Sequence, residues 1–567
     1  MRRARTDSQP PLRRATRRWA AAGVSALAVA AASVVATLPM DSAAFADIAS
    51  PYFAANTNLS DPHIIACPNP SGDGHVGYCL YTSKDLGTGE TPANAYPMNQ
   101  TQLYYSSNGF SNWTFKGVVA AETDIDVAHG GWVPTGANHL WAPAAVHAGD
   151  DYYLYVPDVS DIDDTGTPNI HTSSRINVWK FAGTPFGART NLGFVSSTSG
   201  YMSDPDVLID GANRYLYWAD GDNSSCGGFK SAKLNADMKT LTPNTTTTIT
   251  IAGLPTTAPY ALGTCTQRSD LGGANVGRPY YEGASIYKSS INPGLPSSYV
   301  MVFALKPTVT PFECTAANTG GGADTANEVI AYATASTPQG TFTYQGILMC
   351  GSTTEWTNQA TLLRMQHVLG EVSGNWVMVY HDGPSAPAGV EPNRKLHAAC
   401  LWVGEGKIAG VRRAPATEAN SFNDCMAGAN SDYRPMSVKP KDTNNPVPTP
   451  RLVTAATNSP HTTATNRYVV GPNERWRRES AGGQNFVLRN LRTGKLLCAP
   501  NNLATDVLTA SCTAVDAKST FTFFAFGDTN TQIRHVSLNK YISLDANGLL
   551  HADQGAPSAR FSFYRVV

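Results

Sequence analysis

The chain has 567 residues with a formal net charge of −1, and charged residues make up 15% of it. This near-neutral balance excludes the basic patch that nucleic acid or an anionic membrane surface would require. The 49 glycines, 37 prolines and 24 tyrosines, with few segments of helical period, predict an all-β chain with many turns. The length is suited to two domains rather than one.

Residues 1–46 have the pattern of a secretory signal peptide. Arginines precede an alanine-rich apolar run, and the segment ends in Ala44-Phe45-Ala46, an A-x-A cleavage pattern. A membrane anchor is the alternative, but the alanine content and the cleavage pattern favour removal of the segment. The pair Arg17-Arg18 leaves both Sec and twin-arginine export open. We therefore expect a secreted, extracellular protein.

Ten cysteines in an exported chain favour disulfide bonds over metal ligands, and no CxxC spacing competes with this interpretation. They are neighbours in sequence two by two, so local pairing would staple single hairpins or loops. This is one of many connectivities that ten cysteines allow. The predicted pairs are Cys67/Cys79, Cys226/Cys265, Cys314/Cys350, Cys400/Cys425 and Cys498/Cys512.

A short strand pattern rich in aromatic and β-branched residues recurs five times. Its copies begin at Tyr78, Tyr152, Tyr215, Tyr299 and Trp376, with spacings of 63 to 84 residues. Such spacings allow four strands per unit with generous loops. Five units therefore predict a five-bladed β-propeller over residues 47–430. A β-sandwich with fortuitous spacing is the alternative.

A polar or aromatic cluster precedes the aromatic strand in every unit. The clusters contain Asp61, Trp141-Ala142-Pro143, Asp204, Glu282 and Gln366-His367. The first strand of each propeller blade lines the central channel, so these clusters would converge at one end of it. One Asp-Pro alone would be an ordinary turn, whereas three carboxylates from three blades indicate a functional site.

Hydrolysis of a glycosidic bond needs one carboxylic acid to protonate the leaving oxygen and one carboxylate to activate water or attack carbon. Glu282 suits the acid, because Gly283 leaves room beside it and neighbouring tyrosines can exclude water. Asp61 suits a fixed general base. Asp204 would be a third carboxylate whose charge keeps the acid protonated and oriented.

These motifs resemble those of glycoside hydrolase family 43, which comprises arabinofuranosidases, xylosidases, arabinanases and galactanases. The resemblance rests on Ser60-Asp61-Pro62, Ser203-Asp204-Pro205 and Glu282-Gly283-Ala284, and it covers about residues 50–415. It implies a five-bladed propeller and hydrolysis with inversion. The three motifs would then supply the base, the pKa modulator and the acid, with base and acid far enough apart to hold a water molecule.

Further site residues are predicted around this triplet. Trp141 and Tyr281 are candidates for stacking on sugar, with core packing as the alternative for each, and Arg278 is a candidate hydrogen-bond donor or else a surface arginine. Family members often carry a channel histidine in blade five that can ligate calcium. His367 approximates that position, so a structural calcium ion is possible, while no cofactor is expected to be required.

Residues 431–459 are rich in Pro, Asn and Thr and predict a linker. The remaining residues, 460–567, contain repeated strand units that close at Trp476, Phe523 and Phe563. This pattern resembles fascin-like or ricin-type β-trefoils, which often bind carbohydrate. A purely structural trefoil is the alternative.

Together these observations predict a secreted inverting glycoside hydrolase acting on arabinose-, xylose- or galactose-containing polysaccharides or oligosaccharides. We favour an α-L-arabinofuranosidase, because that activity is frequent in the family. An endo-arabinanase, a β-xylosidase, a galactosidase or galactanase, or a non-catalytic carbohydrate-binding propeller are the alternatives. A propeller adhesin or scaffold would lack converging carboxylates. We expect a monomer that has no nucleic-acid or membrane partner.

Overall fold

The computed structural model describes 24 stretches of the chain and one further single residue, and all structural statements concern these parts. They are residues 58–71, 76–85, 98–107, 113–125, 138–162, 168–196, 201–220, 228–254, 281–288, 299–305, 314, 329–351, 355–364, 376–384, 394–404, 407–411, 434–440, 451–455, 462–465, 469–470, 472–524, 531–545, 549–555, 559–563 and 565–566. The predicted signal peptide lies outside them.

The first part of the chain is built from strands with one short 3-10 helix, η2 (Glu122–Asp124). The strands are β1 (Leu59–Pro68), β2 (Val76–Asp85), β3 (Met98–Ser106), β4 (Thr114–Ala121), β5 (Asn138–Leu140), β6 (Ala144–Ala148), β7 (Asp151–Ile162), β8 (Pro168–Ala182), β9 (Arg189–Phe194), β10 (Ser203–Asp210), β11 (Asn213–Ala219), β12 (Phe229–Lys233), β13 (Thr247–Ala252), β14 (Tyr281–Lys288), β15 (Tyr299–Leu305), β16 (Val329–Ala335), β17 (Thr341–Met349), β18 (Glu355–Arg364), β19 (Trp376–Pro384), β20 (Lys395–Cys400), β21 (Trp402–Gly404) and β22 (Lys407–Val411).

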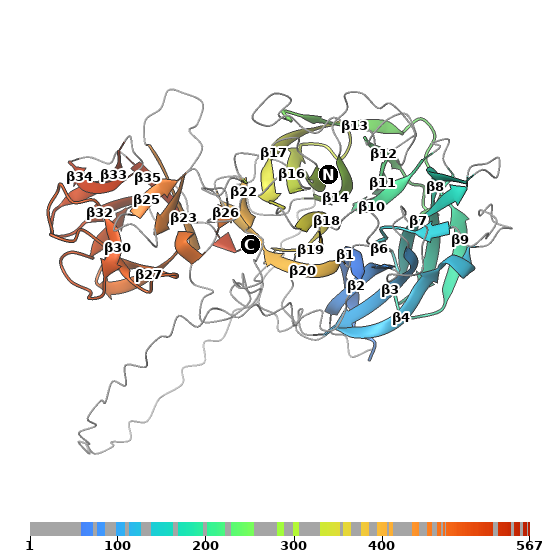
Figure 1. Cartoon of the computed structure of the whole chain (residues 1–567), viewed down its shortest axis with the longest axis horizontal. Coiled ribbons are helices and arrows are strands. Elements are labelled where there is room, and N and C mark those ends of the chain that lie inside the picture. Colours follow the sequence, from blue (N-terminus) through green and yellow to red (C-terminus); the bar gives the residue numbers. More distant parts are fainter. Residues whose placement is uncertain are drawn as a thin grey trace, which may run out of the picture. The chain divides into compact units, whose positions relative to one another are not determined.

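These strands form five blades. Strands β1 to β4 form the first, and β5 to β9 form the second. A parallel pairing of β13 with β17 joins blade three (β10 to β13) to blade four (β14 to β17), and β18, β19 and β20 belong to blade five. The inner strands β1, β6, β10, β14 and β18 contact one another in turn, and β18 contacts β1, so the ring is closed (Figure 1). The predicted five-bladed propeller is confirmed.

The five aromatic patterns found in the sequence are the second strands of the blades, β2, β7, β11, β15 and β19. A second strand lies between two strands of its own blade and is covered on both faces by the neighbouring blades, so its central residues are mostly apolar. Every residue of β15 is buried, for example, and so are Tyr217 and Trp218 of β11. Five apolar clusters result, one between each pair of neighbouring blades.

The C-terminal part of the chain is also made of strands, again with one 3-10 helix, η6 (Pro472–Glu474). The strands are β23 (Arg434–Pro440), β24 (Arg451–Ala455), β25 (Thr462–Thr465), β26 (Val469–Val470), β27 (Arg475–Gly482), β28 (Asn485–Asn490), β29 (Leu496–Cys498), β30 (Thr509–Cys512), β31 (Phe521–Phe524), β32 (Gln532–His535), β33 (Lys540–Leu544), β34 (Leu550–Gln554), β35 (Ala559–Phe563) and β36 (Arg565–Val566).

Six of these strands pair in a closed circuit. The circuit runs β23, β27, β28, β31, β32, β35 and back to β23, with a single bridge, Thr531 to Phe561, closing β32 on β35. Three hairpins accompany it, namely β24–β25, β29–β30 and β33–β34. A separate apolar core fills this part and includes Trp476, Phe523 and Phe561.

Residues 431–459, which we predicted to be a linker, contain two of these strands. Strand β23 pairs with β27 and β35, and β24 pairs with β23 and β25. The described parts of this interval therefore belong to the C-terminal sheet and do not form a linker. Met436 and Val453, one from each strand, are fully buried in its core, which outweighs the polar composition around them.

Three predicted disulfides are present: Cys67–Cys79, Cys314–Cys350 and Cys498–Cys512. The other two pairs include Cys226, Cys265 or Cys425, which lie outside the described residues. Cys498–Cys512 staples the hairpin β29–β30.

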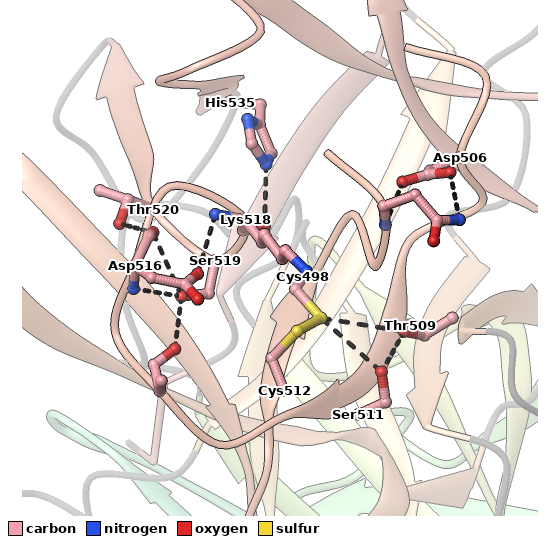
Figure 2. Close-up of a disulfide and its surroundings, with 12 residues drawn as sticks. Cys498, Asp506, Thr509, Ser511, Cys512, Asp516, Lys518, Ser519, Thr520 and His535 are labelled. Carbon is pink, nitrogen blue, oxygen red and sulfur yellow. Dashed lines mark hydrogen bonds between the residues drawn. A yellow bond between two sulfur atoms is a disulfide. The ribbon is translucent and has the colours of Figure 1, made fainter. Parts of the chain in front are cut away.

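Polar side chains surround this C-terminal disulfide (Figure 2). The Cys498 sulfur lies 3.9 Å from the Thr509 hydroxyl and 3.7 Å from the Ser511 hydroxyl (Figure 2). In the intervening loop, the Asp506 carboxylate accepts hydrogen bonds from the backbone N–H groups of Asn501 and Leu503. The hairpin is therefore held at its strands by the disulfide and in its loop by one carboxylate.

Within the described residues, no helix is long and apolar enough to cross a membrane.

Blade two buries one carboxyl group in an apolar setting. Asp158 of β7 is 0% exposed, and neither of its carboxylate oxygens has a hydrogen-bond partner among the described residues. Burial raises the pKa of Asp158 to about 7, and the negative charge of Glu122 acts in the same direction. The positive charges of Arg175 and His139 oppose this rise only in part.

Asp158 should make the fold less stable as pH rises. Its pKa is higher in the folded chain than in the unfolded one, so the destabilisation is absent below about pH 4, grows up to about pH 7 and persists above it. We expect Asp158→Asn to raise the free energy of unfolding by up to about 4 kcal/mol at pH 8 and to change it little at pH 4. Chemical denaturation at several pH values measures this.

The matched control is Asp151→Asn on the same strand. The Lys180 hydrogen bond lowers the pKa of Asp151, so removing that carboxylate should give no stabilisation that grows with pH. A gain for Asp158→Asn that is the same at pH 4 and pH 8 would contradict the assignment.

Candidate active site

Four of the five inner strands are interrupted by a β-bulge at the same point. Pairing with the second strand skips two residues after Ser60 in β1, Ser203 in β10, Glu282 in β14 and Asn358 in β18. The first skipped residue has a left-handed backbone in each case. These residues are Asp61 (φ 49°), Asp204 (φ 46°), Gly283 (φ 63°) and Gln359 (φ 42°).

This bulge explains how the blades present polar side chains to one another. A bulge leaves its extra residue unpaired, bends the strand and re-aims the side chain. A left-handed backbone costs a residue other than glycine about 1 kcal/mol, and such strain concentrates at functional sites. Asp61, Asp204 and Gln359 therefore occupy equivalent positions in blades one, three and five. Glu282 lies one position earlier in blade four, where glycine takes the left-handed position.

Asp61 is held by contacts from three directions. It is 5% exposed, and its carboxylate accepts hydrogen bonds from the Ser60 hydroxyl at 3.2 Å and from Arg394 Nη1 at 3.0 Å. Its own backbone N–H donates to His381 Nδ1 at 3.0 Å. Nδ1 therefore acts as an acceptor, and the imidazole proton lies on Nε2. Burial lowers the pKa of His381 well below its usual range, in keeping with a neutral ring.

Arg394 joins Asp61 to a second carboxylate, Asp85. Nε of Arg394 donates to both Asp85 oxygens, at 3.1 Å and 2.9 Å, while Nη1 donates to Asp61. All three side chains are buried. Burial raises the pKa of Asp61, Arg394 opposes the rise, and the charge of Asp85 adds to it. One arginine thus opposes the cost of burying two carboxylates, and its hydrogen bond fixes the direction of the Asp61 carboxylate.

The negative charges of the other two predicted catalytic carboxylates, Glu282 and Asp61, both act on Asp204. Burial raises the pKa of Asp204 well above its usual range, and the negative charges of Glu282 and then Asp61 raise it further. The Gly283 N–H donates to Asp204 Oδ2 at 3.3 Å, which links Asp204 directly to the strand of Glu282. Because neighbouring carboxylates cannot both ionise at low cost, Asp204 retains its proton at higher pH than an isolated carboxyl would.

Of the remaining predicted site residues, Trp141 is described with its side chain. Trp141 is half-buried between β5 and β6, and its backbone N–H donates to the Pro157 carbonyl at 3.1 Å. In blade two, pairing with β7 is therefore interrupted between β5 and β6, at the position that the bulges occupy in the other blades. Tyr281 begins β14, but its side chain lies outside the described residues. Arg278 and His367 also lie outside them.

Sequence reasoning missed four residues around the carboxylates: Asp85, Gln359, His381 and Arg394. Asp85, His381 and Arg394 reach Asp61 from other strands or another blade, and no local pattern marks Asp85 or Arg394. Gln359 follows Asn358 at the place where Asp61 follows Ser60, so alignment of the blades could have revealed it. The cluster expected at Gln366-His367 falls beyond the end of β18, which is Arg364.

Gln359 extends from blade five across Gly283 in blade four. A Cβ atom added at Gly283 would lie 2.3 Å from Gln359 Oε1, so glycine is required there for close approach as well as for its φ of +63°. The amide of Gln359 is therefore next to the backbone that carries Glu282.

The described residues do not provide a calcium site. Calcium binds six to eight oxygen ligands, and among the described residues no group of three or more His, Cys, Asp or Glu side chains could hold a metal ion. The histidine that the described residues place in the channel is His63 of blade one, and both of its ring nitrogens are engaged by protein groups, Ala145 N–H and Asp206.

Comparison with known proteins agrees with this architecture. Residues 76–288 match the family described as glycosyl hydrolases family 43. This match includes Asp204 and Glu282 and begins after Asp61. No curated protein matches the chain.

Several solved structures are similar to the chain. A β-xylosidase/α-arabinofuranosidase from a compost microbial metagenome, solved with xylotriose in a calcium-free form, is 21% identical, covers 64% of this chain and 96% of its own, and has a TM-score of 0.42. A β-1,3-galactosidase of family 43 is 13% identical, covers 90% and 95%, and has a TM-score of 0.43. An exo-β-1,3-galactanase from Clostridium thermocellum is 12% identical, covers 90% and 96%, and has a TM-score of 0.40.

The fold and the family match define the class of this protein as an inverting glycoside hydrolase built on a five-bladed propeller. More particularly, residues 76–288 match glycoside hydrolase family 43, the family that the Asp-Pro and Glu-Gly motifs resemble.

Removal of Arg394 should shift the pH dependence of hydrolysis. Arg394 lowers the pKa of Asp61, so in Arg394→Met that pKa rises and the ascending limb of the kcat/KM profile moves to higher pH, by about one unit or more. Arg394→Lys keeps the charge and should shift the limb less. An aryl glycoside with a good leaving group is the substrate, because its cleavage reports the base. Arg189→Met, which removes a partly exposed partner of Asp124, is the control.

Substitution of Gly283 should disturb the site through Gln359. Gly283→Ala is expected to reduce kcat about 10- to 100-fold, because the new methyl group collides with the Gln359 amide and displaces the strand of Glu282. The double variant Gly283→Ala/Gln359→Ser should recover part of the loss. Gly211→Ala is the control, since its φ is +61° but nothing lies within 4 Å of the added methyl group. Equal loss in both single variants would show that backbone strain alone is responsible.

Proposed function

We propose that the protein is a secreted α-L-arabinofuranosidase that releases arabinose from polysaccharides or oligosaccharides by a single inverting displacement. Asp61 is the general base, Glu282 the general acid and Asp204 the modulator of the acid. The observation that supports this proposal is that the negative charges of Glu282 and Asp61 both act on Asp204. Carboxylates from three blades therefore lie near one another.

The proposed reaction uses one carboxylate on each side of the sugar. Asp61 removes a proton from water as the water oxygen bonds to the anomeric carbon, and Glu282 gives its proton to the departing glycosidic oxygen. Asp61 then holds the proton that Glu282 needs, and exchange through solvent restores both. Arg394 and Ser60 keep the Asp61 carboxylate oriented, and Asp204, which interacts electrostatically with Glu282, is assigned the modulator role.

The sugar preference rests on the frequency of this activity in the family. A β-xylosidase, a galactosidase or galactanase and an endo-arabinanase are the alternatives that the same site chemistry allows. A substrate panel distinguishes them. It contains aryl arabinofuranosides, xylosides and galactosides together with arabinan, xylo-oligosaccharides and β-1,3-galactan.

We further propose that residues 460–567, together with strands β23 and β24, form a carbohydrate-binding β-trefoil. Its support is the closed circuit of six strands and the three accompanying hairpins. Export is supported by the predicted signal peptide and by the three described disulfides. We expect the protein to act as a monomer, and the substrate remains the only partner proposed.

Glu282→Gln should separate substrates by their leaving groups. Loss of the acid is expected to reduce hydrolysis of arabinan or an alkyl arabinoside by about 100- to 10,000-fold, because the departing oxygen must then leave unprotonated. A dinitrophenyl arabinoside, which needs no proton, should retain most of its rate. Asp61→Asn should reduce both equally, since water activation is common to them.

The stereochemical course gives the second measurement. Proton NMR of the first-formed sugar should show the anomer opposite to that of the substrate. Retention of configuration would contradict the assigned roles. A wild-type protein that binds the polysaccharides and hydrolyses none of the panel would instead indicate the non-catalytic propeller.

A further inference from the structure

A second polar layer crosses the propeller channel one step below the carboxylates. It is made of buried groups from all five inner strands, and none of them belongs to the proposed catalytic set. Its centre is His63 of blade one and Asp206 of blade three, which are 7% and 3% exposed. His63 Nε2 lies 3.1 Å from Asp206 Oδ1.

The hydrogen bonds of this layer fix which atoms donate. His63 Nδ1 accepts from the Ala145 N–H of blade two at 3.2 Å, so the ring proton lies on Nε2 and is donated to Asp206 Oδ1. The same Asp206 oxygen accepts from the Val207 N–H at 2.8 Å. The other oxygen, Oδ2, accepts from the Ile286 N–H of blade four at 2.5 Å.

The layer continues to blade five through the residue after Ile286. The Tyr287 hydroxyl accepts from the Leu362 N–H at 2.6 Å and lies 3.0 Å from the Thr361 hydroxyl. Inner strands that share no backbone hydrogen bonds with one another are thus joined by side chains. The two carboxylate oxygens of Asp206 thus contact the inner strands of two other blades.

The members of this layer follow the catalytic carboxylates at short, fixed intervals. His63 is two residues after Asp61, Asp206 is two residues after Asp204, and Ile286 is four residues after Glu282. A strand rises about 3.3 Å per residue, so each contact lies within about 13 Å of chain from the carboxylate above it. A fixed distance between these strands below the bulges therefore fixes the distance between base and acid above them.

We propose that the His63–Asp206 pair is a positioning device that sets the separation of the base and acid strands. This inference rests on the proposed function of Asp61 and Glu282. A well-packed apolar pair can stabilise a core as much as buried polar groups do, so stability alone gives no reason for this arrangement. A hydrogen-bonded carboxylate has one feature that an apolar pair lacks: each oxygen admits its partner at a defined direction and distance.

Asp206→Asn removes one of the two contacts made by the Asp206 carboxylate and keeps the other. Asparagine offers one acceptor oxygen and one NH2 donor, and the oxygen is needed on the His63 side, where two N–H groups converge. Its NH2 group then faces the Ile286 N–H, and two donors repel. The contact to the acid strand is lost while the contact to the base strand is kept.

We expect Asp206→Asn to lower kcat on a substrate with a poor leaving group about 10- to 100-fold, with KM changed less than about 3-fold. The rate on an activated aryl glycoside should fall much less, because that substrate does not need the Glu282 proton. His63→Leu breaks the contact to the base strand and should lower both rates equally. A role limited to holding the fold would not produce this difference between substrates.

Tyr217→Phe is the matched control. Tyr217 is the register partner of Asp206 on the next strand, and its hydroxyl donates to the Pro338 carbonyl at 2.6 Å, which is also a contact between blades three and four. Its removal should lower the melting temperature and leave kcat on both substrates within about 2-fold. Equal effects of Asp206→Asn and Tyr217→Phe on the two substrates would overturn the proposal.

Hydrogen–deuterium exchange of the full chain provides a readout that is independent of activity. Asp206→Asn should increase exchange in a peptide spanning β14, and Tyr217→Phe should not. If the wild-type protein hydrolyses no glycoside, the proposed function fails, and the positioning role fails with it even where β14 loosens. If the wild type is active and β14 exchanges as before in Asp206→Asn, only the positioning role is overturned.

Discussion

The β-bulge near the start of the inner strands is the constraint on which the site depends. An inner strand must pair with the second strand of its blade, and regular pairing would direct its side chains to the two faces of the sheet. The bulge turns one residue out of that alternation, at the cost of a left-handed backbone. The same distortion in four blades brings Asp61, Asp204, Glu282 and Gln359 to one region of the channel.

Carboxylates that converge in a largely buried site carry negative charges that repel one another. The surroundings of Asp61 and Asp204 differ in how far they stabilise that charge. Asp61 receives Arg394 and Ser60, which support its ionised form, whereas Asp204 receives the negative fields of Glu282 and Asp61 and a single backbone N–H. Burial and nearby carboxylates raise the pKa of both groups, but Arg394 and Ser60 oppose the rise at Asp61, so the pKa rises further at Asp204. This asymmetry is set by which blade supplies the arginine.

Below the carboxylates, the channel is filled by polar groups that satisfy one another. His63, Asp206 and Tyr287 use side-chain atoms to bridge inner strands that do not pair through their backbones. The apolar clusters between blades stabilise the ring, but apolar contacts tolerate sliding because they have no preferred direction. Hydrogen bonds in the channel restrict that sliding close to the reacting groups, where displacements of about 1 Å affect the rate.

The sequence by itself determined the number of blades and three local disulfides and pointed to three candidate carboxylates, because each leaves a local signal. A strand buried on both faces must be apolar, cysteines close in sequence pair most readily, and Ser-Asp-Pro and Glu-Gly-Ala are contiguous motifs. Only the tertiary structure decided that β23 and β24 enter the C-terminal sheet, that Arg394 and Asp85 flank Asp61, and that His63 meets Asp206. These contacts join residues far apart in the chain, and a buried ion pair is specified by where two strands meet rather than by the residues beside either partner.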